Sequence, residues 1–387
     1  MTGADGLSAW RDKLWHAAVA GDEYAAADAA LAALDHDISM ETLLLEVVAP
    51  VQARVGLEWE ANRITVTQEH TATAVNERVL AALAHHPVAR RAAAAREPGA
   101  GRVAVACVDG EWHAMPARIL AEVLRLRGWR VDYLGAQVPA PHLIAHVHRT
   151  GCDVVALSSS IPTRLPAAHA AITACQATGT PVIVGGAAYG PDGRHARLLG
   201  ADAWAPDGRT AADRLAAGPA AAGQAMDYLP HLDDEAYTMV SRSARRLVRH
   251  VMSGLEERIP AMASYTAQQR HHTAEDVAHI VDFLAAALYV DDPELFGRFL
   301  TWTAGVLTAR GVPAGTLLPA LDLLAGRLED FPRASALLAH GHAAVNAAGS
   351  ESLHPATERP HDRLRPKPAE ARPVHAARGH AAHLHSG

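Results

Sequence analysis

The sequence predicts an α/β domain with a doubly wound parallel sheet, preceded and followed by all-α regions. Between residues 102 and 222, short and nearly continuous apolar runs alternate with helical stretches, as in parallel sheets covered by helices on both faces. On either side of this segment, apolar residues recur at the spacing of amphipathic helices. A length of 387 residues allows two or three domains with cores of their own.

Residues 1–90 are expected to form a helical bundle. Ser39 is a suitable N-cap for one helix, and Thr65 with Gln68 three residues later forms a capping-box pattern for another. Four short helices would fit this length. The segment from His86 to Gly101 is basic and interrupted by proline and glycine, so we expect a linker there.

Residues 98–223 contain five β-α repeats, which predict a flavodoxin-like domain. Ligands of such sheets bind beyond the carboxyl ends of the strands. Polar or small residues follow three of the expected strands at that edge: Glu111-Trp112-His113, Ser158-Ser159-Ser160 and Gly185-Gly186. The expected strands lie at 103–108, 129–134, 154–157, 181–184 and 203–204, and the expected helices at 114–127, 139–150, 164–178, 192–199 and 209–218.

Residues 228–345 are expected to form a second helical domain. Thr273 is expected to open one of its helices, and Asp292 another that Gly311 ends. Residues 346–387 are rich in Pro, Ala, His and Arg without periodicity, which predicts a disordered tail. The expected helices lie near 234–257, 273–290, 293–310 and 314–328.

Composition and charge argue against several classes of protein. The net charge of −7 gives no basic footprint, so direct nucleic-acid binding is not expected. No apolar run has the length of a membrane span, and the first residues lack the pattern of a signal peptide. Cys107, Cys152 and Cys175 fall in predicted core segments, as expected for free thiols in a reducing compartment. We therefore expect a cytoplasmic protein without membrane contact.

A histidine beside a carboxylate at a strand end suits metal ligation, because a carboxylate bonded to one ring nitrogen fixes the tautomer. Glu111-x-His113, Ser158-x-Ser160 and Gly185-Gly186 together resemble the D/E-x-H-x-x-G, S-x-L and G-G pattern of base-off, His-on cobalamin domains. The resemblance implies that His113 is the axial ligand of the cobalamin cobalt and that Glu111 orients it. Ser158, Ser160, Gly185 and Gly186 would then line the channel for the nucleotide tail.

Two positions depart from this pattern. Pro116 stands where the family usually has glycine, and Ser160 where leucine or threonine is common. An ordinary flavodoxin-like domain with a surface histidine is the alternative.

Trp59, followed ten residues later by Glu69-His70, resembles the cap bundle of cobalamin-dependent light-sensing regulators and of methionine-synthase-like modules. The resemblance implies that Trp59, Glu69 and His70 lie over the corrin, against an adenosyl group, and that adenosylcobalamin is the cofactor. Light-sensing regulators carry a histidine directly after the Trp, whereas this chain has Glu60, which puts a bis-histidine light product there in doubt. The alternative is a bundle-core Trp59 and a solvated Glu69-His70 pair.

The C-terminal region contains residues that suit an anionic, flat, conjugated ligand. Arginine forks bind carboxylates, and aromatic rings pack on flat faces. The order of parts resembles the photocobilins, in which a globin-like third domain binds a bilin beside cobalamin. The resemblance implies biliverdin as a second cofactor, and the alternatives are a solvated arginine stripe with a core Trp, or a partner-docking surface. The candidate residues are Arg245, Arg249, His271, His272 and Trp302.

The function expected from these parts is a cobalamin-dependent light sensor without catalysis of its own. Photolysis of the upper cobalt ligand would rearrange the domains, and biliverdin would extend the response to red light. No helix-turn-helix or effector module is visible in the sequence, so output would pass through a downstream protein or a change in oligomeric state, such as a homo-oligomer. The alternatives are a corrinoid carrier protein for methyl transfer and a cobalamin-sensing regulatory or interaction protein.

Overall fold

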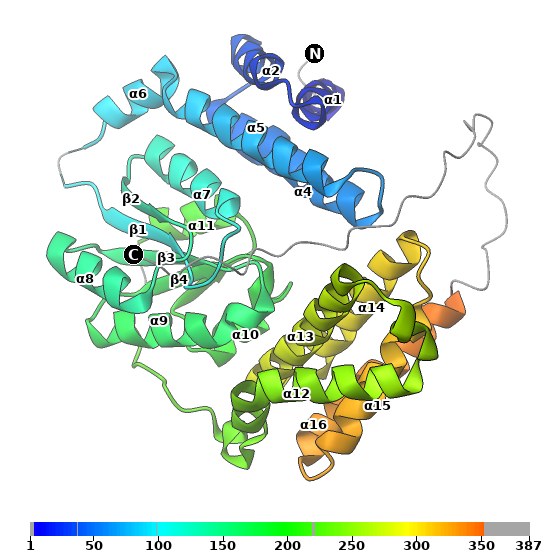
Figure 1. Cartoon of the computed structure of the whole chain (residues 1–387). Coiled ribbons are helices and arrows are strands. Elements are labelled where there is room, and N and C mark those ends of the chain that lie inside the picture. Colours follow the sequence, from blue (N-terminus) through cyan, green and yellow to red (C-terminus); the bar gives the residue numbers. More distant parts are fainter. Residues whose placement is uncertain (1–3, 37, 98, 219–220, 352–387) are drawn as a thin grey trace, which may run out of the picture.

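The computed structural model describes residues 4–36, 38–97, 99–218 and 221–351. An α/β unit lies between an N-terminal and a C-terminal helical unit (Figure 1). The parallel five-stranded sheet combined with helical units confirms the predicted fold class. In the part of the chain so described, no helix has both the length and the apolar character that crossing a membrane requires.

The N-terminal unit is helical throughout, as predicted. Ser39 caps the first turn of its central helices, and Thr65 with Gln68 forms the expected capping box. Figure 1 shows helices α4 and α5 side by side along the α/β unit. The elements are α1 (Ala4–Ala20), α2 (Glu23–Asp35), α3 (Met40–Thr42), the π-helix η1 (Leu43–Val48), α4 (Ala49–Glu60) and α5 (Val66–Ala84).

The expected linker from His86 to Gly101 is only partly a linker. Residues Pro87–Ala94 form helix α6, so this part of the prediction was wrong. Pro87 stands at the start of the helix, where its missing N–H is not needed, and His86 Nδ1 accepts a hydrogen bond of 3.3 Å from the Val88 N–H.

The five predicted strands form one parallel sheet with the order β2-β1-β3-β4-β5, which is the doubly wound order expected. The order reverses at β1, since its neighbours β2 and β3 both follow it in the chain. The carboxyl ends of β1 and β3 therefore flank the point where ligands of such sheets bind. The strands are β1 (Arg102–Cys107), β2 (Arg130–Gly135), β3 (Val154–Ser158), β4 (Val182–Gly185) and β5 (Ala203–Ala205).

Each face of the sheet belongs to a different hydrophobic core. Val105 of β1 packs in a core shared with the N-terminal unit, whereas its neighbour Ala106 packs in a core shared with the C-terminal unit. This alternation follows from the two-residue period of a strand. The first face is covered by α7 (Met115–Leu126) and α11 (Gly208–Ala216), and the second by α8 (Ala140–Thr150), α9 (Leu165–Ala177) and α10 (Arg194–Leu198).

The C-terminal unit differs from the prediction at two boundaries. Helix α13 begins at Ala267 behind a Thr266–Gln269 capping box, and not at Thr273. Helix α16 was not predicted, and it continues past the expected boundary at residue 345 to Glu351. The rest of the expected tail, 352–387, lies outside the described residues. The helices are α12 (Ala236–Arg258), α13 (Ala267–Val290), α14 (Pro293–Ala309), α15 (Leu318–Arg327) and α16 (Pro332–Glu351).

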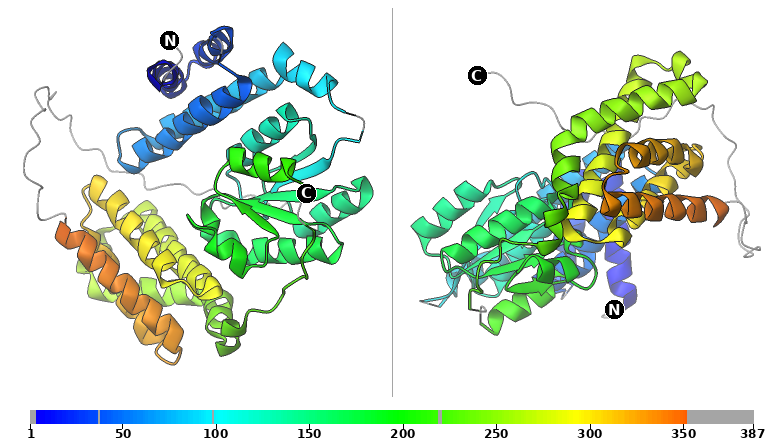
Figure 2. Two further views of the ribbon diagram at one scale, coloured as in Figure 1. Left: turned by 180° about the vertical axis from the view of Figure 1, so that it is seen from behind. Right: turned by 90° about the horizontal axis from the view of Figure 1, so that it is seen from below.

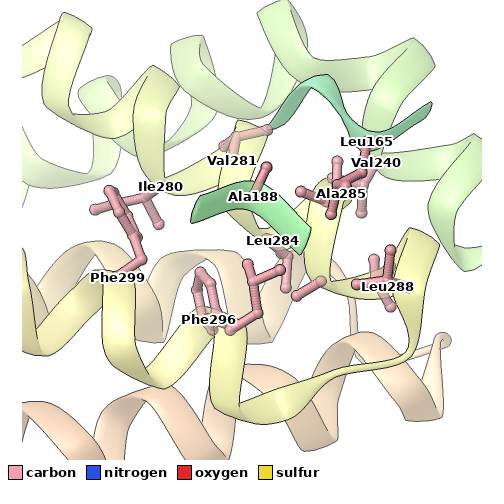
Figure 3. Close-up of a cluster of buried hydrophobic side chains, with 14 of the residues drawn as sticks. Leu165, Ala188, Val240, Ile280, Val281, Leu284, Ala285, Leu288, Phe296 and Phe299 are labelled. Carbon is pink, nitrogen blue, oxygen red and sulfur yellow. The ribbon is translucent and has the colours of Figure 1, made fainter. Parts of the chain in front are cut away.

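The C-terminal unit packs against loops at the carboxyl edge of the sheet. Figure 3 shows Leu165 and Ala188 of the α/β unit among the side chains of α13 and α14, including Leu284. A buried ion pair reinforces this contact, with His195 Nε2 lying 2.9 Å from Asp292 Oδ2. The two views in Figure 2 also show these helices beside the α/β unit. Packing against this edge sets the C-terminal unit next to the expected ligand site.

Candidate functional site

Glu111 and His113 lie in the loop that leaves the carboxyl end of β1. Gly110 has a φ of +75°, a conformation that favours glycine, and it turns the chain just before Glu111. Pro116 lies in the first turn of α7, where a proline is tolerated, so its departure from the expected pattern is compatible with the helix start. Glu111 is fully buried, whereas 47% of the His113 side chain is exposed. The histidine is thus accessible and the carboxylate is not.

The Glu111 carboxylate joins the loops that follow β1 and β3. Its Oε1 atom accepts a hydrogen bond of 2.9 Å from the His113 N–H and lies 2.7 Å from His113 Nδ1. Its Oε2 atom accepts hydrogen bonds from the main-chain N–H groups of Ser160 at 2.6 Å and Ile161 at 2.9 Å. These contacts confirm the closeness of Glu111 and His113 expected from the sequence.

These hydrogen bonds determine the state of the histidine. Burial alone would raise the pKa of Glu111, but the bonds from His113, Ile161 and Ser160 outweigh burial and lower the pKa to about 2. The carboxylate is therefore ionised and can only accept hydrogen bonds. His113 Nδ1 must then carry the proton, and in the neutral ring the lone pair lies on Nε2, the atom available to a metal.

The serines and glycines lie together at the same edge, in the predicted places. Ser158, at the end of β3, is the register partner of Cys107 and Gly185. Ser160 binds Glu111 through its main chain, a role that its side-chain type did not predict. The hydroxyl of Ser159 lies 3.4 Å from the same carboxylate, whereas the sequence pattern assigned a role only to its neighbours Ser158 and Ser160.

Gly186 serves the packing of the chain itself. It has a φ of +105°, and a Cβ atom there would lie 2.3 Å from the Ser159 carbonyl oxygen. Any side chain at this position would force apart the loops that follow β3 and β4. The double glycine thus keeps these loops close enough for Ser159 and Ser160 to reach Glu111.

Two polar groups at this edge have no hydrogen-bond partner among the described residues. One is the hydroxyl of Tyr189, a fully buried side chain, and the other is the buried Nε atom of Arg164. Burial raises the pKa of Tyr189, and the Glu111 charge raises it further. Buried polar groups normally have partners, so these two groups fit a ligand with polar substituents that enters beside Glu111.

Trp59, at the end of α4, lies between the N-terminal and C-terminal units. It packs at the margin of the bundle core, and its ring centre lies 6.5 Å from that of Trp302. Arg310 donates to the carbonyl oxygens of Trp59 at 3.2 Å and Glu60 at 3.3 Å. Trp59 is therefore neither a pure core residue nor a solvated one, and it contacts the third unit directly.

Glu69 and His70 form a contact at the start of α5. The His70 Nδ1 atom bonds to the Glu69 carboxylate, which also accepts a hydrogen bond of 3.1 Å from the Thr73 hydroxyl. The His70 side chain is 63% exposed, so one edge of the imidazole remains open to a ligand or to solvent.

The structure does not bring the five candidates of the C-terminal unit together. Arg245 and Arg249 lie on the exposed face of α12. His271 and His272 contact Glu275 near the start of α13, at 3.3 and 3.1 Å. Phe299, which neighbours Trp302, stacks on Phe283, and at 1.5 Å per residue Phe283 lies about 16 Å along α13 from His272. Trp302 therefore lies apart from His272, and a bilin site that uses these five residues stays a prediction.

A pocket of about 430 Å³ adjoins Trp302 between α14 and α16. Arg298 and His340 supply cationic or hydrogen-bonding groups, and Glu60 of the N-terminal unit borders the pocket. Arg298 and His340 could not be predicted as site residues, since α16 was not expected and nothing in their spacing marks a site. The lining consists of Glu60, Glu294, Gly297, Arg298, Thr301, Trp302, Gly305, His340 and Ala344.

Another group of potential metal ligands lies at the opposite edge of the sheet. Ligand atoms of Asp132, His146 and Cys152 lie within 4.8 Å of one another. Arg102 donates to both oxygens of Asp132, at 2.9 and 3.2 Å, and compensates its charge. We therefore assign no metal to this group.

Comparison with known proteins identifies both units in front of the C-terminal helices. Residues 10–84 and residues 101–216 each match a family model described as a B12 binding domain. The chain is 36% identical over 149 residues to the HTH-type transcriptional repressor CarH of Myxococcus xanthus, covering 37% of this chain and 46% of the repressor. It is 30% identical over 184 residues to the repressor CarA of the same organism, covering 46% of this chain and 57% of the repressor. The chain thus spans about half the length of these curated relatives.

Solved structures of corrinoid proteins are also similar in part. The monomethylamine corrinoid protein of Methanosarcina barkeri matches with a TM-score of 0.45 and 17% identity, over 53% of this chain and 96% of that one. A cobalamin-binding protein of Desulfitobacterium hafniense matches with a TM-score of 0.30 and 17% identity, over 54% of this chain and 97% of that one. The two matched domains, together with the Glu111–His113 geometry in the second of them, indicate that cobalamin is the cofactor of this chain.

Proposed function

We propose that this protein is a light sensor that binds adenosylcobalamin, with His113 as the lower ligand of the cobalt. The observation that carries the cofactor assignment is the ionised Glu111 carboxylate, 2.7 Å from His113 Nδ1, which leaves Nε2 as the ligating atom. When bound, adenosylcobalamin would supply a cobalt–carbon bond that light breaks. Trp59, Glu69 and His70 would line its upper side, as their resemblance to light-sensing regulators implies.

The contact between Trp59 and the C-terminal unit supports a route for the signal. Arg310 holds the last carbonyl groups of α4, and Trp302 lies against the Trp59 ring. A change in packing on the upper side would alter this contact, because the same tryptophan belongs to both. We propose that the C-terminal unit transmits the change to a downstream protein or to a second copy of the chain.

Biliverdin is the second chromophore that we propose for the C-terminal unit. The pocket beside Trp302 supports this assignment, because Arg298 and His340 could hold anionic and polar groups of a bilin whose ring system packs on the indole. Arg245, Arg249, His271 and His272 contribute no residue to that pocket. A bilin there would lie next to the Trp59 end of the cap.

A corrinoid carrier for methyl transfer is the second candidate, since the two B12 binding domains would suffice for it. The buried pairing of His195 with Asp292 disfavours this role. A carrier must expose its cofactor to a partner enzyme, whereas this ion pair fixes helices against the ligand-binding edge of the sheet.

The test is a comparison of the protein in the dark and after green illumination. Apoprotein is loaded with adenosylcobalamin in darkness, and its size is measured by chromatography with light scattering before and after illumination. Protein loaded with hydroxocobalamin, which lacks the cobalt–carbon bond, is the control and should show no change. We expect the illuminated adenosylcobalamin form to differ in size or elution. Identical dark and illuminated forms, with binding established by the bound spectrum, would refute the light sensor.

The biliverdin assignment has its own test. Protein produced with biliverdin should show a far-red absorption band that is lost in Trp302→Ala and retained in Arg249→Ala. A spectrum without such a band would remove biliverdin from the proposal and leave cobalamin binding unaffected.

A further inference from the structure

Arg164 is a half-buried arginine in the loop region that carries His113. It ends the short 3-10 helix η2 (Pro162–Arg164), which follows β3. Its guanidinium carbon lies 5.9 Å from the centre of the Trp112 ring. A Cβ atom on Gly110 would lie 3.0 Å from Arg164 Nη1, so the guanidinium packs closely against this glycine. Arg164 therefore lies directly against the loop between β1 and α7.

The guanidinium group has no conventional polar partner within the described part of the chain. Its Nε atom is buried without a hydrogen bond, and no ion pair within 4.0 Å is formed. Arg164 does lie within electrostatic range of Asp282 on α13. Burial raises the pKa of Asp282, and the charges of His279 and Arg164 oppose part of this rise. The side chain is half-buried, and Nε is the donor that has lost water without a replacement, which is costly. The fold thus holds a cation whose full set of partners is not supplied by the protein.

The chemistry of cobalamin offers one group that suits such a cation. The side chains around the corrin are neutral amides, and the phosphodiester of the nucleotide tail is the anionic group. Arginine presents a fork of donors that matches phosphate oxygens. Glu111, the buried carboxylate of the loop, already has its oxygens occupied by hydrogen bonds. An anion that binds at this edge can therefore accept hydrogen bonds from the unpaired N–H groups of Arg164.

We propose that Arg164 binds the phosphate of the nucleotide tail when cobalamin occupies the site. This inference rests on cobalamin binding and is independent of the light response. It adds a specificity determinant: the site selects complete cobalamin over corrinoids that lack the tail. The Trp112 ring contacts both the His113 ring and the Arg164 guanidinium. This cation–π contact holds the guanidinium beside the loop that carries His113.

The test compares two ligands and two arginine variants. Apoprotein is titrated with hydroxocobalamin and with hydroxocobinamide, which lacks the nucleotide and its phosphate, and binding is followed by visible absorption. Arg164→Met should weaken cobalamin binding about 10- to 100-fold and leave the cobinamide affinity unchanged. The melting temperature of the Arg164→Met apoprotein should stay the same or rise, because the variant removes a buried donor without a partner.

Arg118→Met is the matched control. Arg118 is also a half-buried arginine, but it has a protein partner, because its Nε donates to Glu122 at 3.0 Å. This variant should lower the melting temperature of the apoprotein and leave both affinities unchanged.

Several results would overturn the inference. Equal weakening for both ligands in Arg164→Met would point to a corrin amide and not to the phosphate. A lower melting temperature with unchanged affinities would make Arg164 a structural residue. Failure of the unaltered protein to bind either ligand would instead refute cobalamin binding itself, and that outcome is distinct from the other two.

Discussion

Replacing Glu111 with glutamine should weaken cobalamin binding, because the buried carboxylate fixes the proton on His113. Glutamine keeps the shape of the side chain but replaces one acceptor oxygen by an NH2 group. If this NH2 group faces Ser160 and Ile161, it meets two N–H donors at the positions where the carboxylate accepts bonds of 2.6 and 2.9 Å. If it faces His113, it donates to Nδ1 and moves the ring proton to Nε2, the atom that cobalt needs.

Two effects set the size of the change. One pKa unit corresponds to about 1.4 kcal/mol. The pKa of Glu111 is about 2 in the folded protein and has its ordinary value in the unfolded chain. This difference stabilises the folded protein by about 3 kcal/mol at neutral pH. Loss of the group that orients a metal-binding histidine weakens metal binding about 10- to 100-fold. We expect both losses in Glu111→Gln.

Urea unfolding of the apoprotein measures the stability, and titration with hydroxocobalamin measures the affinity. Glu122→Gln is the matched control, since Glu122 is also buried but binds Arg118 and Arg125 on α7, away from His113. It should lose stability with an unchanged affinity for cobalamin. If Glu111→Gln binds cobalamin as tightly as the unaltered protein does, the reasoning about the tautomer is refuted.

Three further predictions concern the same elements. Because the pKa of Glu111 is lowered to about 2, its contribution to stability should be complete above about pH 4.3 and should disappear as the pH falls towards 2, and Glu111→Gln should lack this acid dependence in urea unfolding. Gly186→Ala should destabilise the protein more than Gly128→Ala. Both glycines have a positive φ, which costs alanine about 1–2 kcal/mol, but only at Gly186 would the added Cβ also clash with main-chain atoms. Equal losses in urea unfolding would contradict this account. Arg310→Leu should speed amide hydrogen exchange at the end of α4 next to Trp59, and unchanged exchange there would show that Arg310 does not join the two units.

Much of the fold could be predicted because its local patterns agree with its packing. The alternating apolar runs marked all five strands, and Thr65 with Gln68 marked the start of α5. Helix α6 was missed because its eight residues make only about two turns and none of them is buried. The start of α13 was misplaced because Thr273 also suits an N-cap, while the real cap, Thr266, lies about two turns earlier.

The candidate site was predictable where two residues close in sequence act together. Glu111 and His113 are two positions apart, so their contact follows from one loop. The other partners of Glu111 are main-chain N–H groups of Ser160 and Ile161, which no side-chain pattern reveals. Arg164 escaped notice for a similar reason, since only the fold brings it against Gly110.

The C-terminal unit shows where residue types mislead. Arginine, histidine and tryptophan suit a bilin, but helical spacing alone could not tell that Arg245 and Arg249 are exposed and do not line the pocket beside Trp302. The pocket beside Trp302 depends on α14 crossing α16. Gly297 permits that crossing, because a Cβ atom there would lie 2.8 Å from His340 Nε2. Such a long-range contact leaves no local signal in the sequence.

The most direct test of the central claim asks whether a histidine nitrogen binds the cobalt. The protein is produced with histidine labelled with the heavy nitrogen isotope, loaded with cobalamin and reduced to the paramagnetic cobalt(II) state for electron paramagnetic resonance. If His113 is the lower ligand, labelling should convert the triplet nitrogen splitting of each cobalt line into a doublet, and His113→Ala should abolish that doublet. A triplet that persists in the labelled protein would mean that the cofactor keeps its own base, and it would contradict the account.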